Sequence, residues 1–125
     1  MELKQNKLRQ LEIGRRRGWV VYLAYTAKPM PLTFNTLIEL LDARNMPLTH
    51  RRFAEHLDFL RSIGFVKIFP IANSVEISNL EQTKIIQAYC DNDGDGGDGY
   101  CIGLTTRGIN FQEGHFEETG VLRMN

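Results

Sequence analysis

Two runs of residues in this sequence have types and spacings that could do chemistry, and the first is acidic. Residues 90–101 read CDNDGDGGDGYC, which places four aspartates among glycines and between the only two cysteines of the chain. The first half fits the D-x-D-x-D-G pattern of an EF-hand calcium loop, but Ile102 stands where that loop needs a bidentate glutamate. A cation-binding module remains an alternative, and the sequence favours a flexible, self-repelling turn with no metal or other cofactor. The four aspartates are Asp91, Asp93, Asp95 and Asp98.

Other reactive side chains are too scattered to indicate an enzyme. Cys90 and Cys101 are expected to face each other across the acidic turn as small, partly buried thiols, reduced in a cytoplasmic compartment. Neither cysteine has a base partner in the sequence, and no CxxC or HExxH pair could bind zinc. His50, His56 and His115 do not share a face, and no glycine-rich phosphate loop follows a predicted strand.

The second run is basic and begins a predicted helix. Residues 49–52 occupy the place where the second helix of a helix-turn-helix contacts base edges and phosphates. Arginines there can reach guanine or phosphate, and a threonine can contact phosphate at the helix N-terminus. Residues 15–17 are three further arginines, and basic residues at 4, 7 and 9 could add an arm. The candidate DNA-binding residues are Thr49, His50, Arg51, Arg52, Arg15, Arg16 and Arg17.

Acidic side chains on the same helix oppose this interpretation. Glu55 and Asp58 are expected on the exposed side that carries Arg51, where they would face DNA. Arg51 and Glu55 also have i,i+4 spacing, which allows them to pair on the surface. Double-stranded DNA is the predicted partner, and a protein partner is the alternative that the mixed charge leaves open.

Length and composition indicate the class of protein that carries these sites. The chain has 125 residues, 42% of them hydrophobic and 24% charged, which indicates a single soluble domain with a core of its own. No apolar run approaches the roughly 20 residues that cross a membrane, and residues 1–12 lack the apolar core of a signal peptide. We therefore expect a cytoplasmic protein without a membrane partner. Residues 1–61 carry eleven basic and six acidic side chains, whereas 62–125 carry four and nine, so the zero net charge hides a basic first half.

A repeated tetrapeptide locates the helix-turn-helix. MPLT occurs at 30–33 and 46–49, and each copy ends in a threonine suited to cap the helix that follows. Apolar residues then recur at helical spacing in both segments, and Gly64 offers a left-handed cap after the second. The predicted apolar stripes are Phe34, Leu37, Ile38 and Leu41 in the first helix, and Phe53, Leu57, Leu60 and Ile63 in the second.

The remaining pattern predicts a winged helix-turn-helix, an α+β fold. A third helix begins near Trp19 and stops near Pro29, weakened at its start by Gly14 and Gly18. Two strands at 65–69 and 100–104 form a hairpin, and Thr105 or Thr106 caps a short terminal helix. The single domain, 1–125, divides into an N-terminal arm or helix (1–13), a helical part (14–64), an elongated wing (65–104) and a tail (105–125).

The long excursion between the two strands is ambiguous. Residues 74–78 look extended, and Ser78 and Glu81 have the spacing of a capping box, which favours a helix over 79–89. The similar pairs at 89–90 and 100–101 favour instead a second hairpin with the acidic turn as its tip, and we prefer that interpretation. An aspartate-rich wing tip would be repelled by phosphate, so in a DNA-binding domain it should point away from the DNA.

The end of the chain resembles a known family. LTTRGINFQEGHFEETGV, residues 104–121, resembles the tail "LTxxGxxxxEGxxxxxGI" of small winged-helix proteins from Mu-like transposable phages and prophages. The junction FLRSIGFV at 59–66 is similar to their "YLxxxGLV" junction, whereas the excursion 71–99 is longer than their wing. The tail matches at Leu104, Thr105, Gly108, Glu113, Gly114, Gly120 and Val121.

This resemblance implies a function in a phage or prophage context. DNA binding in that family is assumed from the fold, so the implied protein is a transcriptional regulator or another DNA-associated protein. Many such domains act as two-fold dimers, and the N-terminal helices could supply the interface. The alternative is a winged-helix module of phage origin that binds proteins and not DNA.

Overall fold

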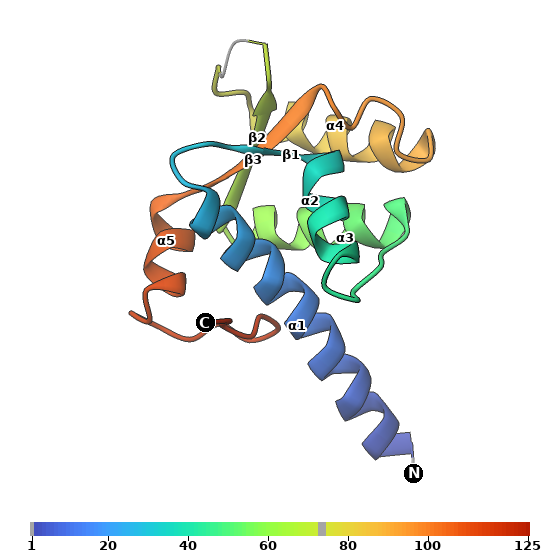
Figure 1. Cartoon of the computed structure of the whole chain (residues 1–125), viewed down its shortest axis with the longest axis vertical. Helices are drawn as coiled ribbons and strands as arrows, with labels where there is room; N and C mark the ends of the chain where they lie inside the picture. The colour runs from blue at the N-terminus through green and yellow to red at the C-terminus, as the bar shows by residue number, and fades with distance from the viewer. Residues whose placement is uncertain (1, 73–74) are drawn as a thin grey trace.

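The computed structural model describes residues 2–72 and 75–125, which fold as an α+β structure with five helices and one small antiparallel sheet (Figure 1). None of the described helices is long and apolar enough to cross a membrane. The elements in chain order are α1 (Glu2–Ala27), β1 (Leu32–Thr33), α2 (Phe34–Asp42), α3 (His50–Ser62), β2 (Val66–Pro70), α4 (Asn79–Asp91), β3 (Tyr100–Leu104) and α5 (Thr106–Gln112).

The sheet contains the two predicted strands and one that the sequence did not reveal. β2 and β3 pair antiparallel, with Ile68 opposite Ile102, as the expected hairpin requires. β1 adds to the other side of β3, where Leu32 also lies opposite Ile102, so the strand order is β1-β3-β2. Two residues are too few to show the alternating pattern by which strands are recognised. This element order and strand order are compatible with a winged-helix-like fold.

The core lies where the helices meet the sheet. The predicted apolar stripes of α2 and α3 are confirmed as buried, except that Ile38 and Ile63 are only half-buried at its edge. The largest side chains in the core that are fully shielded from solvent are Phe34, Phe53, Phe65, Phe111, Leu37, Leu41, Leu57 and Leu60.

Local capping fixes the helix ends, as the sequence predicted. The hydroxyls of Thr33 and Thr49 each accept the backbone N–H three residues on, at 3.1 Å. Thr105 caps α5 in the same way, which confirms the short terminal helix. After α3, Gly64 has φ +80°, and the N–H of Phe65 donates to the Leu60 carbonyl. The boundaries of α2 and α3 therefore follow from side chains within a few residues of each end.

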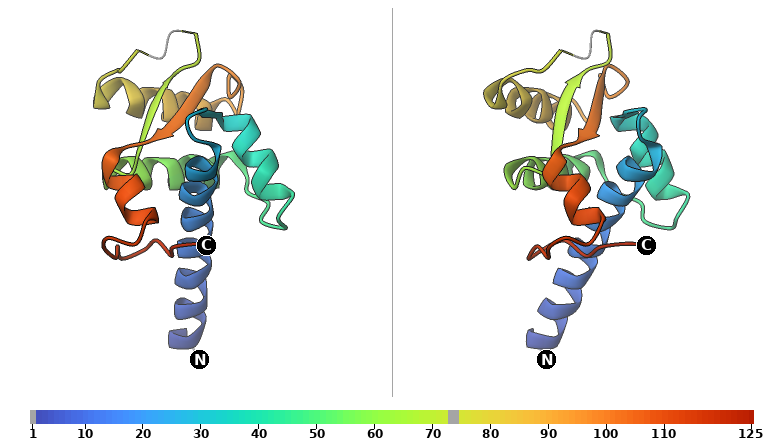
Figure 2. Two further views of the ribbon diagram at one scale, coloured as in Figure 1. Left: turned by 60° about the vertical axis from the view of Figure 1, so that its left-hand side comes forward. Right: turned by 90° about the vertical axis from the view of Figure 1, so that its left-hand side faces the viewer.

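The expected division of the first 27 residues into two parts is wrong, because α1 is one continuous helix of 26 residues. Gly14 and Gly18 do not break it but mark the face across which the C-terminal tail passes. The N–H of Leu122 donates to the Gly14 carbonyl at 3.0 Å, and a Cβ on Gly18 would collide with the backbone of Leu122. The N-terminal end of α1 projects beyond the rest of the chain (Figure 2).

The preference for a strand at 79–89 is also wrong, since this segment is helix α4. Ser78 caps it by accepting the N–H of Glu81 at 3.2 Å, as the capping-box spacing indicated. Gln82 is buried and bridges two backbones: its Oε1 accepts from the N–H of Ile68 in β2, and its Nε2 donates to the carbonyl of Ile77, both at 3.0 Å. Through Gln82, α4 therefore binds the outer edge of the sheet at β2, and β1, not a second hairpin, pairs with the other side of β3.

The acidic stretch is therefore not a wing tip. It connects the end of α4 to β3 by a series of turns, so Cys90 on α4 and Cys101 in β3 do not face each other across a hairpin. Both cysteines are free, and Cys101 is buried. Residues 75–78 form no strand, and Ser74, the first residue of the stretch predicted as extended, lies outside the described residues.

Candidate nucleic-acid interface

The first turn of α3 presents two of the predicted arginines to solvent. Arg51 and Arg52 are both exposed, and Thr49 uses its hydroxyl to cap the helix. Arg51 lies 3.8 Å from the carboxylate of Glu55, which confirms the predicted i,i+4 pair. Such an exposed pair contributes little stability and can be exchanged for a phosphate contact.

His50, by contrast, is half-buried and makes a contact within the fold. Its Nδ1 is 2.8 Å from the hydroxyl of Tyr89, and the two rings meet edge to face at 5.5 Å. Burial, together with the nearby Asp93 carboxylate, raises the pKa of Tyr89 to about 12, so the phenol keeps its proton. His50 therefore links α3 to the C-terminal end of α4 and is occupied by that contact.

The acidic loop, residues 91–99, flanks α3 on the side of His50. Its aspartates line a shallow hollow of about 530 Å³ together with Glu39 and Asn35 of α2. The acidic loop therefore lies beside the start of α3, so a duplex docked there would have to avoid its negative charge. Within residues 2–72 and 75–125, no group of three or more His, Cys, Asp or Glu side chains is arranged to hold a metal ion. The aspartates in the hollow are Asp93, Asp95 and Asp98.

The other flank of α3 is basic. A groove of about 300 Å³ lies between α1 and the first turns of α3, and we call it the α1–α3 groove. It brings Arg9 and Arg16 of α1 next to Arg52 of α3, although these residues are far apart in the sequence. The complete lining is Arg9, Glu12, Ile13, Arg16, Pro47, Leu48, Thr49, Arg52 and His56.

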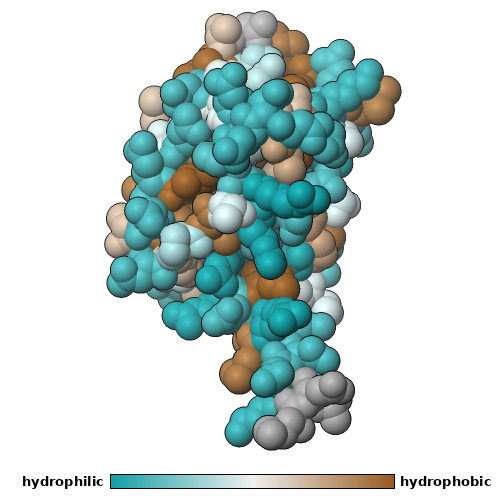
Figure 3. Space-filling view, turned by 90° about the vertical axis from the view of Figure 1, so that its right-hand side faces the viewer, coloured by the Kyte–Doolittle hydropathy of each residue, from teal (hydrophilic) through white to brown (hydrophobic). Residues whose placement is uncertain are grey.

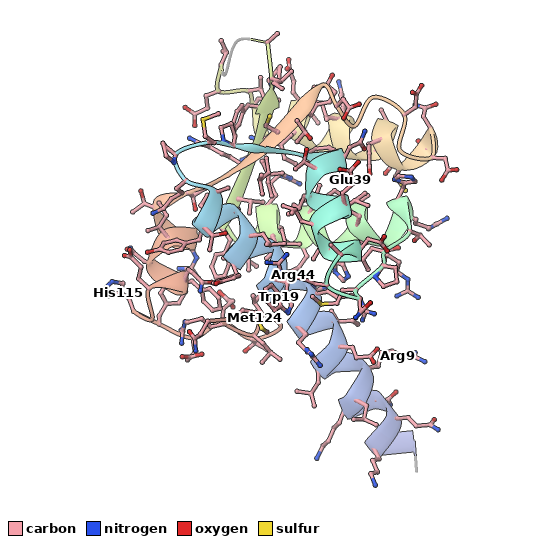
Figure 4. The ribbon with its side chains drawn as sticks, in the orientation of Figure 1. Arg9, Trp19, Glu39, Arg44, His115 and Met124 are labelled. Carbon is pink, nitrogen blue, oxygen red and sulfur yellow. The ribbon has the colours of Figure 1, made fainter. Side chains whose placement is uncertain are left out.

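The two flanks can be followed in the figures. In Figure 4, Glu39 lies on α2 in the upper half of the view, whereas Arg9 projects from the lower part of α1. The side of the molecule at the right of Figure 1 is mainly hydrophilic, with smaller apolar areas between (Figure 3). A polar or charged partner suits this side better than an apolar one.

Arg16 is incompletely paired in the groove. Its Nη1 lies 3.5 Å from a carboxylate oxygen of Glu12, whereas its Nε is buried and has no hydrogen-bond partner. A buried donor without an acceptor costs free energy, roughly 1–3 kcal/mol. Arg15, one residue earlier, is exposed and does not line the groove.

The side chain of Arg17 makes contacts within the fold. Its Nε donates to Nδ1 of His56 at 3.3 Å, its Nη1 to the Gly120 carbonyl at 3.4 Å, and its guanidinium stacks 3.6 Å from the centre of the Phe59 ring. Burial first, and then the positive charges of Arg17, Arg16 and Arg52, together lower the pKa of His56 to about 4. His56 is therefore neutral at pH 7, and the three arginines place positive potential at the groove.

The predicted site residues thus separate into two groups. Thr49, Arg52 and Arg16 meet at the α1–α3 groove, with Arg51 and Arg15 exposed outside it, whereas His50 and Arg17 make internal contacts. Sequence reasoning placed Arg9 only in a general basic arm and did not group His56 with the basic residues. Residues 9, 13 and 16 are spaced so that they lie on one face of α1, and this spacing could have grouped Arg9 with Arg16.

α4 limits access to the middle of α3. Its residues Thr83, Ile86 and Cys90 line a small hollow together with Ala54 and Asp58 of α3. The part of α3 that stays open carries both signs of charge, including a 2.8 Å ion pair between Arg61 and Asp58. The N-terminal end of α3 with its α1 flank, by contrast, carries three arginines and one carboxylate.

Comparisons with protein-family models, with curated proteins and with solved structures gave no match to this chain.

Proposed function

We propose that this protein is a winged-helix protein that binds double-stranded DNA. The observation that carries the proposal is the meeting of Arg9, Arg16 and Arg52 at the first turns of α3. In a helix-turn-helix, this end of the second helix approaches the base edges while neighbouring elements contact phosphates. The element order and the strand order β1-β3-β2 support the winged-helix assignment.

Each basic residue has a role in this proposal. Arg51, which projects from the exposed side of the first turn, contacts bases or phosphate after releasing Glu55. Arg52 and Arg16 contact phosphate from the α1–α3 groove, and Arg15 adds positive charge beside it. Following the resemblance of its tail, we place the protein in a phage or prophage as a regulator or DNA-associated protein.

We further propose a homodimer formed through α1. The N-terminal end of this helix projects from the body (Figure 2), and Leu8 and Leu11 on it are 57% and 51% exposed. A short helical end that projects without tertiary contacts is marginally stable in water. A second copy of the chain that covers these leucines would therefore stabilise the projecting end of α1. Sedimentation velocity tests the dimer: a monomer at all accessible concentrations would contradict it.

The decisive experiment is fluorescence anisotropy with mixed duplex DNA at two salt concentrations. We expect binding that weakens as salt rises, with a log–log slope that falls by about 2 in Arg51→Ala/Arg52→Ala if both arginines contact phosphate. The matched control is Lys67→Ala/Lys84→Ala, which removes the same charge from exposed positions on β2 and α4. Absence of binding at low salt, or equal loss in both variants, would refute the proposal.

A protein partner is the second candidate, favoured by the acidic loop beside His50 and by the cover that α4 provides over α3. A duplex that lay across the whole of α3 would meet Glu55, Asp58 and the aspartates of the loop. If DNA binding fails at low salt while the chain is folded, this alternative takes precedence.

A further inference from the structure

We infer that the α1–α3 groove is a seat for one phosphate group, held by Arg9, Arg16 and Arg52. The inference deepens the proposed function, and it rests on that function only for the source of the phosphate, a nucleic-acid backbone. It goes beyond a general basic surface because it assigns a place, a set of donors and a stoichiometry of one.

The charges lining the groove favour an anion. Three arginines and one carboxylate, Glu12, leave an excess of two positive charges, because His56 is neutral at pH 7. No ion pair or hydrogen bond to an acid is found for Arg9 or Arg52 among the described residues. Within residues 2–72 and 75–125, the only acid bonded to Arg16 is Glu12, at 3.5 Å. These guanidinium groups are therefore available to an incoming ligand.

The donors also suit a phosphate. Arg16 lines the groove, and the guanidinium can exchange its 3.5 Å contact with Glu12 for a ligand oxygen. Guanidinium groups bind phosphate oxygens in pairs, and the charge assistance makes each hydrogen bond stronger than a neutral one. The N-terminal end of α3 borders the groove through Thr49 and Arg52. The positive end of the helix dipole therefore also favours an anion there. The site is open at the surface, as a backbone phosphate of a long polymer requires.

The test uses the full-length chain labelled with ¹⁵N and titrated with inorganic phosphate against chloride at constant ionic strength and pH 7. We expect saturable shifts of the Arg16 and Arg52 Nε–H signals with one-site behaviour. Arg16→Gln should weaken phosphate binding about tenfold or more, since it removes a charge-assisted contact. Lys84→Gln removes the same charge from an exposed position on α4, outside the groove, and should retain binding.

A second variant keeps the test informative if Arg16→Gln fails to fold. Glu12 is 69% exposed, so Glu12→Gln should leave stability unchanged and tighten phosphate binding, because it removes the competing carboxylate. Equal shifts with phosphate and chloride, or equal loss of binding in Arg16→Gln and Lys84→Gln, would contradict the proposed phosphate seat.

The same variants separate this inference from the proposed function. If duplex DNA binds and Arg16→Gln changes neither affinity nor salt slope, the seat is refuted and the DNA proposal stands. If phosphate binds at the seat but DNA does not, the ligand is a free phosphate compound and the DNA proposal fails. If DNA and phosphate both bind and Arg16→Gln weakens both, the seat receives a backbone phosphate.

Discussion

Gly18 lies directly beneath the backbone of Leu122, so that a Cβ atom at position 18 would overlap the Leu122 carbonyl. Four residues earlier on the same face of α1, Gly14 accepts a hydrogen bond from the N–H of Leu122. The tail is held on its other side by Arg123, which donates to the carbonyls of Phe111 and Phe116. The two glycines thus allow the tail to lie against α1.

Replacing Gly18 by alanine should destabilise the protein by about 1–3 kcal/mol, because backbone must move to admit the methyl group. Gly14→Ala is the matched control, since its Cβ would be crowded by the side chain of Leu122, at 3.3 Å, and would meet the Gly120 backbone at an ordinary contact distance of 3.5 Å. That side chain can shift, and alanine favours the helix by up to about 1 kcal/mol. Urea unfolding monitored by circular dichroism would measure the free energy of unfolding of both variants. Equal effects of the two changes would contradict the tail contact.

Acid should destabilise the fold through His56. Its pKa in the folded protein is about 4, below the ordinary 6.5, so its contribution to stability is present above pH 6.5 and is lost as pH falls toward 4. The free energy of unfolding should drop by up to about 3 kcal/mol over that range from this residue alone. His56→Gln, which keeps an acceptor for Arg17, should show a shallower decline. Urea titrations of both proteins at pH 7 and 4.5 give the comparison, and parallel declines would exclude His56 as the cause.

Removing the side chain of Gln82 should loosen α4 from the sheet. Gln82→Ala leaves the N–H of Ile68 and the carbonyl of Ile77 without partners, which costs about 1–3 kcal/mol for each group that stays buried. Gln87 is exposed on the same helix and bonds only Asp91, so Gln87→Ala should change stability by about 0.5 kcal/mol or less. Hydrogen exchange at the Ile68 amide reports the loosening directly. Unchanged protection there in Gln82→Ala would contradict the bridging role.

Neutralising the acidic loop should strengthen DNA binding if DNA docks at the start of α3. Removing three negative charges beside His50 lowers the repulsion of phosphates, so affinity at low salt should rise several-fold and the gain should shrink as salt rises. A control removes three exposed carboxylates elsewhere. Unchanged affinity in the loop variant would mean that DNA does not approach this flank. The loop changes are Asp93→Asn, Asp95→Asn and Asp98→Asn, and the control changes are Glu76→Gln, Glu81→Gln and Glu117→Gln.

The elements that were correctly predicted are those fixed by neighbouring residues. Thr49 and Gly64 set the two ends of α3 through a hydroxyl and a positive φ, and both signals are visible in the sequence. β2 and β3 were recognisable because each is a short apolar run ended by turn residues. Arg51 and Glu55 pair as i,i+4 spacing predicts.

The elements that were missed depend on contacts between distant segments. α4 shows little amphipathic character of its own, so periodicity did not reveal it. Its position depends on polar contacts with distant segments, such as those of Gln82 with β2 and Tyr89 with α3. α1 stays continuous through Gly18 because the tail, about a hundred residues later, occupies the space beside it.

The sequence by itself determined the two capped helices α2 and α3, the basic first turn of α3 and a separate acidic run. Only the tertiary structure decided that Arg9 and Arg16 would stand beside Arg52, with the acidic loop on the opposite flank of α3. Local capping and periodicity act over a few residues, whereas the packing of α1 and α4 against α3 sets the electrostatic surface, and no local pattern encodes that packing.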